Sequence, residues 1–184
     1  MYRLDIEPMD LGPGVRAVAL SLVDAEEGVE PVRGSEGASV WSRVLPAIAG
    51  EAPWTLDFFS HLDRAREFCE RHGIPFREAG RRTLLIPAPP PETLESLLSR
   101  FEGETFGARA GGILPAEDPE LEGELSRRGV DAYHNAFPRY LFCAVCEFGD
   151  GSLVLLSEKL LASEVIRRVR PVLRELDVEV TLPA

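Results

Sequence analysis

The chain is poor in lysine and in cysteine, and it has no long apolar run. Lys159 is the single lysine among 20 basic residues, and the others are arginines. Its three cysteines cannot close a disulfide framework, which favours a reducing compartment. No apolar run approaches the ~20 residues that a membrane-spanning helix needs. Residues 1–10 lack the basic and apolar segments of a secretory signal, so we expect a cytoplasmic protein.

An excess of positive charge is also absent. The 31 acidic residues outnumber the 20 basic ones and give a formal net charge of −11. Binding to nucleic acid needs a basic face, and so does binding to an anionic membrane surface. We therefore expect neither nucleic acid nor a membrane as a partner, although a local basic pocket is compatible with this overall charge.

The remaining composition is that of an ordinary globular protein. Hydrophobic residues make up 45% of the 184 residues and charged residues 28%, which is typical of a soluble chain with a core. The length suits one domain or two small ones. This composition does not distinguish one fold class from another, whereas local sequence patterns do.

The first part of the chain predicts one strand, a loop and a short helix. Residues 15–23 alternate small side chains with branched apolar ones, which is typical of a strand buried on at least one side. Residues 24–38 are acidic and rich in glycine, and they predict a long surface loop. Residues 39–49 predict a short helix that Pro46 limits.

The clearest early helix is predicted at 55–72. Thr55 is placed to act as its N-cap, and Gly73 follows where a left-handed residue ends a helix. Apolar residues recur with helical spacing on one side of this segment. Asp57 and His61, four residues apart, are then typical of a solvated surface pair.

The remaining segments predict strands and helices in a repeated order. The predicted strands are 74–78, 82–86, 104–110, 139–148, 152–156 and 178–182, and the predicted helices are 91–102, 118–128 and 158–176. From residue 55 onward the order α-ββ-α-β occurs twice. With strand 15–23 in front of it, the first unit has the order of the ferredoxin-like motif.

This order predicts an α+β protein of two packed α-ββ-α-β (ferredoxin-like) units with a mainly antiparallel sheet. We assign residues 1–112 to an N-terminal ferredoxin-like unit with a long loop at 24–54, and residues 113–184 to a C-terminal α-ββ-α-β unit. The second unit has no opening strand of its own. Either it borrows one from elsewhere in the chain, or a single sheet spans both units, and in both cases we expect one compact body.

The cysteines offer one metal-binding pattern. Cys143 and Cys146 form a CxxC, and Cys69 and His72 form a CxxH at the end of a predicted helix. Together they would supply the three sulfur ligands and one nitrogen ligand of a structural zinc site. On a strand, however, residues three apart point to opposite faces, so Cys143 and Cys146 are better explained as small core residues. We therefore expect no metal and no cofactor.

A second pattern would suit catalysis. His134 lies in a predicted loop just before the strand that carries Cys143, so the imidazole could activate that thiol. Asp131 is in the same loop and could exchange or orient a proton. The loop also holds Tyr133 and Phe137, which would anchor it on the core. No nucleophile motif surrounds the cysteine, and the chain has no GxSxG.

Paired arginines form the third pattern. Arg81 with Arg82, and Arg127 with Arg128, present guanidinium forks that suit carboxylate or phosphate groups. If these pairs converge in a cleft, they would bind a small anionic molecule. In a chain with 31 acidic residues, however, most arginines are expected to lie near a carboxylate.

Because no catalytic pattern is complete, the sequence favours a non-catalytic binding or regulatory module. We expect a protein partner or a small anionic molecule as its ligand, and a homodimer through a sheet edge or the helix 158–176. The alternative is a small enzyme that uses residues 131–147, with His134 as the central residue. Either Cys143 or Asp131 would then act with that histidine. A structural zinc protein is the third interpretation.

Overall fold

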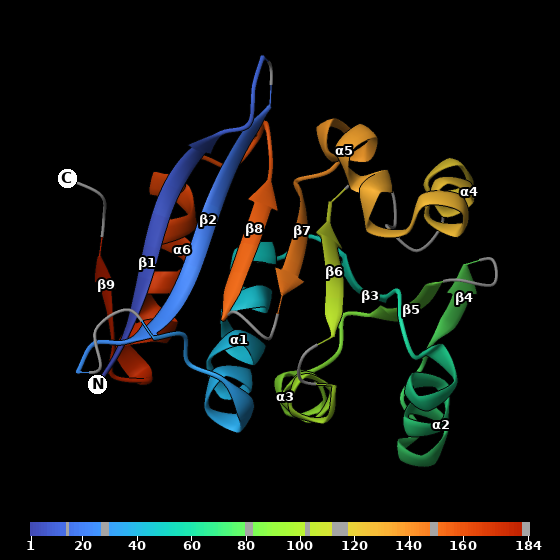
Figure 1. Ribbon diagram of the computed structural model, residues 1–184, viewed down its shortest axis with the longest axis horizontal. Helices are drawn as coiled ribbons and strands as arrows, with labels where there is room; N and C mark the ends of the chain where they lie inside the picture. The colour runs from blue at the N-terminus through green and yellow to red at the C-terminus, as the bar shows by residue number, and fades with distance from the viewer. Residues whose placement is uncertain are drawn as a thin grey trace.

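One sheet runs through the whole molecule. The computed structural model describes residues 1–13, 15–26, 30–79, 83–101, 104–111, 118–147 and 151–181. Within these ranges nine strands pair in the order β4-β5-β3-β6-β7-β8-β2-β1-β9 (Figure 1). All neighbouring strands are antiparallel except β1 and β9, which run parallel. The strands are β1 (Tyr2–Asp10), β2 (Arg16–Asp24), β3 (Trp54–Phe58), β4 (Arg77–Ala79), β5 (Thr83–Pro87), β6 (Thr105–Ala110), β7 (Phe142–Glu147), β8 (Ser152–Leu156) and β9 (Val178–Thr181). The prediction of an α+β protein with a mainly antiparallel sheet is confirmed.

Helices cover the two faces of the sheet unequally. One face, here called the helical face, is covered by α1, α2, α3 and α6, whereas α4, α5 and two 3-10 turns lie on part of the opposite face (Figure 1). The helices are α1 (Gly34–Ala49), α2 (Leu62–His72), α3 (Pro91–Arg100), α4 (Pro119–Arg128), α5 (Tyr133–Ala136) and α6 (Ala162–Glu175), and the 3-10 turns are η2 (Gly129–Ala132) and η3 (Phe137–Arg139). No helix in the described ranges is long and apolar enough to span a membrane.

The alternation of side chains along the strands builds two cores. In β7, Ala144 and Cys146 belong to the larger core beneath the helical face, whereas Cys143 belongs to a smaller core beneath α4 and α5. Successive strand residues point to opposite faces, so a single strand contributes to both cores. Trp41 of α1 and Val169 of α6 are among the buried residues of the larger core. The sheet is therefore covered on both faces only where α4 and α5 lie.

The predicted pair of ferredoxin-like units is not confirmed. The strand expected to open the first unit, β2, pairs with β8 on one side and with β1 on the other. It is therefore separated from β3 by β8, β7 and β6. The chain follows the second of the two arrangements considered above, with a single sheet spanning both halves. Strands β6 and β7 pair with each other, although they lie on opposite sides of the boundary expected between the two units at residue 112.

The predicted helix 55–72 is wrong in its first part. Residues Trp54–Phe58 form β3, and all five are buried. Apolar residues in this segment also satisfy a helical spacing, but Trp54, Leu56 and Phe58 alternate with Thr55 and Asp57 at the period of two that a strand has. The helix α2 begins at Leu62 after His61, whose φ is 49°. Its predicted end is confirmed, because Gly73 caps it with φ 64° in the left-handed region.

The predicted loop near the N-terminus is also wrong in part. Residues Gly34–Ala49 form α1, which passes through Pro46, so neither a loop over 24–38 nor one over 24–54 describes this region. The apolar side of α1 is buried in the larger core, and this packing compensates for the hydrogen bond that proline removes. Residues 27–29 of the predicted loop lie outside the described residues. The strand β1 was not predicted at all.

Candidate functional site

The residues 118–140, here called the cap, lie against the second face of the sheet. Tyr133 and Phe137 of the cap are buried in the smaller core, which confirms their predicted role as anchors. Asp118 begins α4 by accepting a hydrogen bond from the backbone N–H of Leu121 at 3.0 Å. The hydroxyl of Tyr140 also donates to this carboxylate, at 2.6 Å. The two ends of the cap are thus joined to each other.

Beneath the cap lies a fully buried cluster of charged and polar side chains. Nε of Arg109 donates to Oδ2 of Asp57 at 2.9 Å, and both side chains are 0% exposed. The hydroxyl of Tyr133 donates to the same Oδ2 at 2.6 Å. The hydroxyl of Thr55 donates to Oδ1 at 2.9 Å. The guanidinium of Arg109 also lies over the ring of Tyr140, with Cζ 5.8 Å from the ring centroid. We call Thr55, Asp57, Arg109 and Tyr133 the buried cluster.

The register of the sheet brings the cluster together. Asp57 of β3 lies opposite Gly107 of β6, and Thr55 lies opposite Arg109. Side chains two residues apart share a face, so the carboxylate and the guanidinium are diagonal neighbours on the second face. The absence of a side chain at Gly107 leaves room for the ring and hydroxyl of Tyr133, since a Cβ at Gly107 would overlap that hydroxyl.

The charges of the cluster are balanced and closed to solvent. Burial opposes the charge on Arg109, but the neighbouring Asp57 outweighs it, so the pKa of the guanidinium is raised. Burial, followed by the charge of Asp57, raises the pKa of Tyr133 well above its ordinary value. Both groups therefore keep one protonation state at neutral pH. The cluster fixes the cap on the sheet. Among the described residues, Nη1 and Nη2 of Arg109 are buried without a hydrogen-bond partner, so only Nε of this guanidinium is paired.

The structure does not bring the predicted zinc ligands together. Cys143 lies in the smaller core, whereas Cys146 and Cys69 lie in the larger one on the other side of the sheet. His72 is exposed at the end of α2. Burial raises the pKa of Cys69 to about 11 and that of Cys146 to about 12. Among the described residues, no group of three or more His, Cys, Asp or Glu side chains is arranged to hold a metal ion.

The predicted catalytic residues are also kept apart. His134 and Asp131 are exposed on the cap, whereas Cys143 is 0% exposed. Burial raises the pKa of the Cys143 thiol far above neutral pH, which keeps it protonated. A protonated, enclosed thiol is a poor nucleophile.

The predicted arginine pairs are occupied by carboxylates where they are described. Arg127 and Arg128 of α4 both form ion pairs with Glu124. Arg81 and Arg82 lie outside the described residues. Arg127 and Arg128 therefore lie near a carboxylate, as expected for most arginines of this acidic chain.

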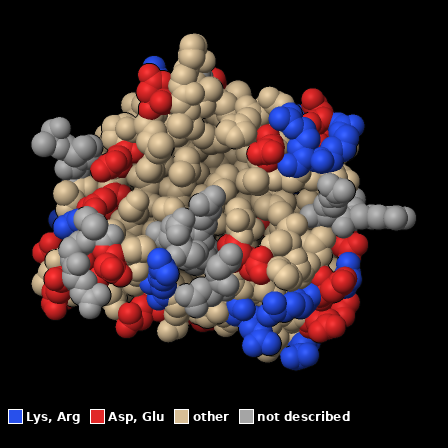
Figure 2. Space-filling view, in the orientation of Figure 1, with Lys and Arg blue, Asp and Glu red and all other residues tan. Residues whose placement is uncertain are grey.

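A large part of the second face is left uncovered by the cap. The side chains of Ala19, Val154 and Val145 lie side by side across β2, β8 and β7, and all three are partly exposed. Val154 and Val145 also pack against the edge of the smaller core. Ser21 of β2 and Ser152 of β8 form the next row. We call these five residues the open face. Figure 2 views the molecule from this side and shows uncharged surface over its upper centre, with acidic side chains at the left, towards β1.

The side of the open face formed by β1 is acidic. Glu7 lies opposite Ala19 and is exposed, and Asp5 lies opposite Ser21. Asp5 is paired with Arg3. Among the described residues, Glu7 has no ion-pair partner, which leaves its charge available to a neighbouring molecule.

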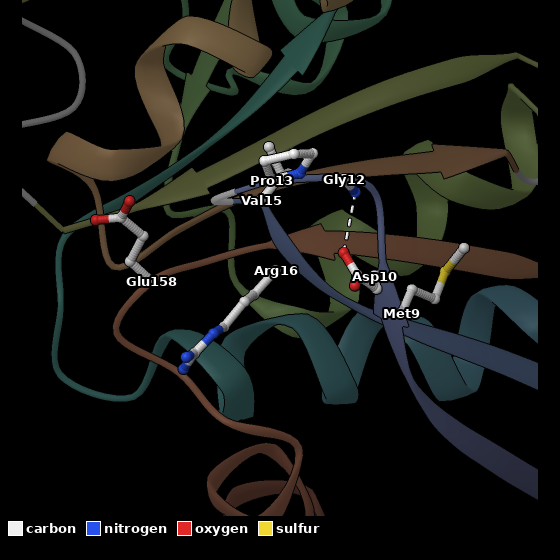
Figure 3. A pocket seen from close by; sticks show the side chains of 7 residues that line it. All are labelled: Met9, Asp10, Gly12, Pro13, Val15, Arg16 and Glu158. Atoms are coloured by element: carbon white, nitrogen blue, oxygen red, sulfur yellow. Dashed lines mark hydrogen bonds between the residues drawn. The ribbon is translucent and has the colours of Figure 1, made fainter.

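A large pocket lies at the end of the β1–β2 hairpin. Its volume is about 790 Å³, and its lining includes Met9, Val15 and Arg16 together with the carboxylates of Asp10 and Glu158. Figure 3 shows that Asp10 is turned towards the backbone N–H of Gly12, from which it accepts a hydrogen bond at 3.0 Å. Met9 lies opposite Ala17, so the pocket continues the apolar surface of the open face.

The buried cluster and the open face were both missed from the sequence. A charged residue in each of two adjacent strands, Asp57 and Arg109, is the signal that would have revealed the cluster. That signal could not be used because residues 55–58 were assigned to a helix. The chain matches no protein-family model, and no match is found among curated proteins or among solved structures.

The carboxylate of Asp118 provides a test of how the cap is held. Its burial opposes ionisation, but hydrogen bonds from Leu121 and Tyr140 and the charge of Arg139 outweigh this effect and lower its pKa. A lowered pKa in the folded state gives stability that is present above the unfolded value and lost as the pH falls through the folded value. We expect Asp118→Ala to cost about 1 kcal/mol at pH 7, typical of a lost N-cap.

Urea unfolding of both proteins at several pH values between pH 7 and pH 2 measures this effect. The difference between wild type and Asp118→Ala should shrink as the pH falls below about 4, the ordinary range of an aspartate. Asp63→Ala, at a side chain that is 91% exposed, is the control. A difference that stays constant with pH would show that the charge of Asp118 does not hold the cap.

Proposed function

We propose that the protein is a non-catalytic binding module, and that its open face docks a protein partner with basic side chains. The observation that carries this proposal is the uncharged row of Ala19, Val154 and Val145 with the exposed carboxylate of Glu7 beside it. The titratable groups beneath the cap support the same conclusion, because Asp57, Arg109 and Tyr133 are fully buried and Asp57 accepts hydrogen bonds from the other two.

The shape of the open face suits a protein rather than a small molecule. Its side chains are short, so the strands present a smooth surface, and Met9 and Val15 of the hairpin pocket extend its apolar part. An interface of this kind places apolar contacts in the centre and charged contacts at the rim. Short, rigid side chains also lose little conformational entropy when a partner covers them.

The charge of the rim determines the kind of partner. Glu7 and Asp10 on β1, and Glu158 after β8, are exposed around the apolar surface and outnumber the exposed Arg16 of β2. A partner with lysine or arginine at its own rim would complement these charges and associate faster. A second copy of the chain would instead bring another net charge of −11 to the contact, which disfavours a homodimer through this face.

Site-specific photo-crosslinking tests the proposal in the cell that makes the protein. A photoreactive amino acid at Ala19, on the open face, should capture one defined partner. The same group at Arg43, which is exposed on α1, should not capture it. The partner is then purified, and its affinity for the wild-type chain and for variants is measured by calorimetry at several salt concentrations.

Two variants separate the roles of the centre and the rim. We expect Val154→Arg to weaken binding by at least about 10-fold, since it buries an unpaired charge at the interface. Glu7→Lys should mainly slow association and reduce the salt dependence. Capture of a second copy of this chain, or an affinity that Val154→Arg leaves unchanged, would overturn the proposal.

A further inference from the structure

A second and separate site lies on the helical face, between α2 and α3. A pocket of about 320 Å³ opens there, and its lining is rich in basic residues. Arg64, Arg71 and His72 reach it from α2, and Arg100 reaches it from α3. In Figure 2 basic side chains gather at the lower right, in the region where Figure 1 places α2.

These basic groups differ from their neighbours because carboxylates do not neutralise them. On the same helix, Arg66 forms ion pairs with Asp63 and Glu78. Within the described ranges, no ion pair involves Arg64, Arg71, His72 or Arg100, and the only carboxylate that lines the pocket is Glu67. In a chain with 31 acidic and 20 basic residues, such a concentration of uncompensated positive charge is unusual.

Helix termini explain only part of this arrangement. Arg71, His72 and Arg100 lie in the last turns of their helices, where a cation is favoured by the helix dipole. That effect places each residue near its own helix end, but it does not require that both helices end at one pocket. Arg64 is near the start of α2, where a cation is not favoured in this way.

Aromatic rings complete the pocket. Phe101 lies beneath the guanidinium of Arg64, which is 5.8 Å from the ring centroid. The rings of Phe68 and His72 are in contact, with centroids 4.4 Å apart and an angle of 37° between their planes. These contacts hold the Arg64 and His72 side chains at the pocket, so less conformational entropy is lost when a ligand binds.

We propose that this pocket binds the phosphate group of a small phosphorylated molecule. Three guanidinium groups and an imidazole offer more donors than the two oxygens of a carboxylate can accept, whereas a phosphate presents three strongly accepting oxygens. The volume is at the lower end of the range for ligand pockets, about 300–1,000 Å³, which suits a small molecule. The site lies on the opposite side of the sheet from the open face and is independent of it.

Calorimetry of the full chain with inorganic pyrophosphate tests this assignment, at an ionic strength held constant with sodium chloride. The double variant Arg71→Ala/Arg100→Ala should weaken binding at least 10-fold. The matched control is Arg127→Ala/Arg128→Ala, which removes the same charge from exposed positions on α4 and should leave the affinity unchanged. Thermal unfolding verifies that both variants are folded, as expected for substitutions of exposed side chains.

The same experiment can reject the proposal in two ways. If both double variants weaken binding equally, pyrophosphate responds to the overall charge and not to the pocket. If wild-type protein shows no heat of binding at millimolar pyrophosphate, and no amide of α2 or α3 shifts in NMR spectra, the pocket does not bind phosphate.

Discussion

Replacement of Asp57 with alanine is expected to lower the free energy of unfolding by about 3–5 kcal/mol, the usual cost of removing one partner from a buried ion pair. The substitution leaves the guanidinium of Arg109 without a counter-charge in the interior. It also removes the acceptor of the hydrogen bonds from Tyr133 and Thr55. Urea unfolding, with the midpoint and slope determined separately, measures the loss.

Two further proteins show whether the loss comes from the unpaired charge. Asp63→Ala removes a carboxylate whose side chain is 91% exposed, and it should change stability by less than about 0.5 kcal/mol. The double variant Asp57→Leu/Arg109→Met replaces both charges with apolar groups and should recover part of the stability that Asp57→Ala loses. An Asp57→Ala protein as stable as the Asp63→Ala control would contradict the role of the buried cluster.

Gly107→Ala is expected to destabilise the protein by about 3 kcal/mol, because overpacking costs 1–3 kcal/mol and a hydrogen bond to a charged group is lost as well. The new Cβ would lie 2.7 Å from Cε2 and Cζ of the Tyr133 ring, and it would overlap the hydroxyl. Tyr133 must then move away from Asp57, so the cap separates from the sheet. Chemical denaturation measures the change.

Gly123→Ala provides a control of opposite sign. Gly123 lies inside α4, and a Cβ built there has no atom within 4 Å. Replacing a helical glycine with alanine should stabilise the protein by about 0.5–1 kcal/mol. In a Tyr133→Ala background, the effect of Gly107→Ala should largely vanish, since the clash is gone. A Gly107→Ala effect that persists there would assign the loss to the backbone of β6 instead.

Much of the local structure could be predicted from the sequence. The helical spacing of Leu94, Leu97 and Leu98 identified α3, and the apolar run around Cys143 identified β7. These features depend on residues close together in the chain. The pairing of β2 with β8 could not be predicted in the same way, because it joins residues more than 130 positions apart and leaves no local pattern.

The sites were harder to predict for a different reason. Asp57 and Arg109 are each unremarkable in sequence, and only the register of β3 and β6 makes them partners. The pocket between α2 and α3 likewise depends on how the ends of two helices meet. Cys143 and Cys146 show the opposite case, because the period of two along a strand was enough to place the two thiols on different faces.

The order of the strands has a consequence for how the chain folds during synthesis. Of the nine strands described, β1 and β2 are made before the others and pair with each other, but their outer neighbours, β9 and β8, are made after the others. One face of the hairpin is apolar, and its outer edges stay unpaired until β8 and β9 have been made. Contacts between such distant segments slow folding, since a long loop must close before they form. Pro8, which has no N–H to donate, lies in the half of β1 that β9 does not cover, where it hinders pairing with another nascent chain.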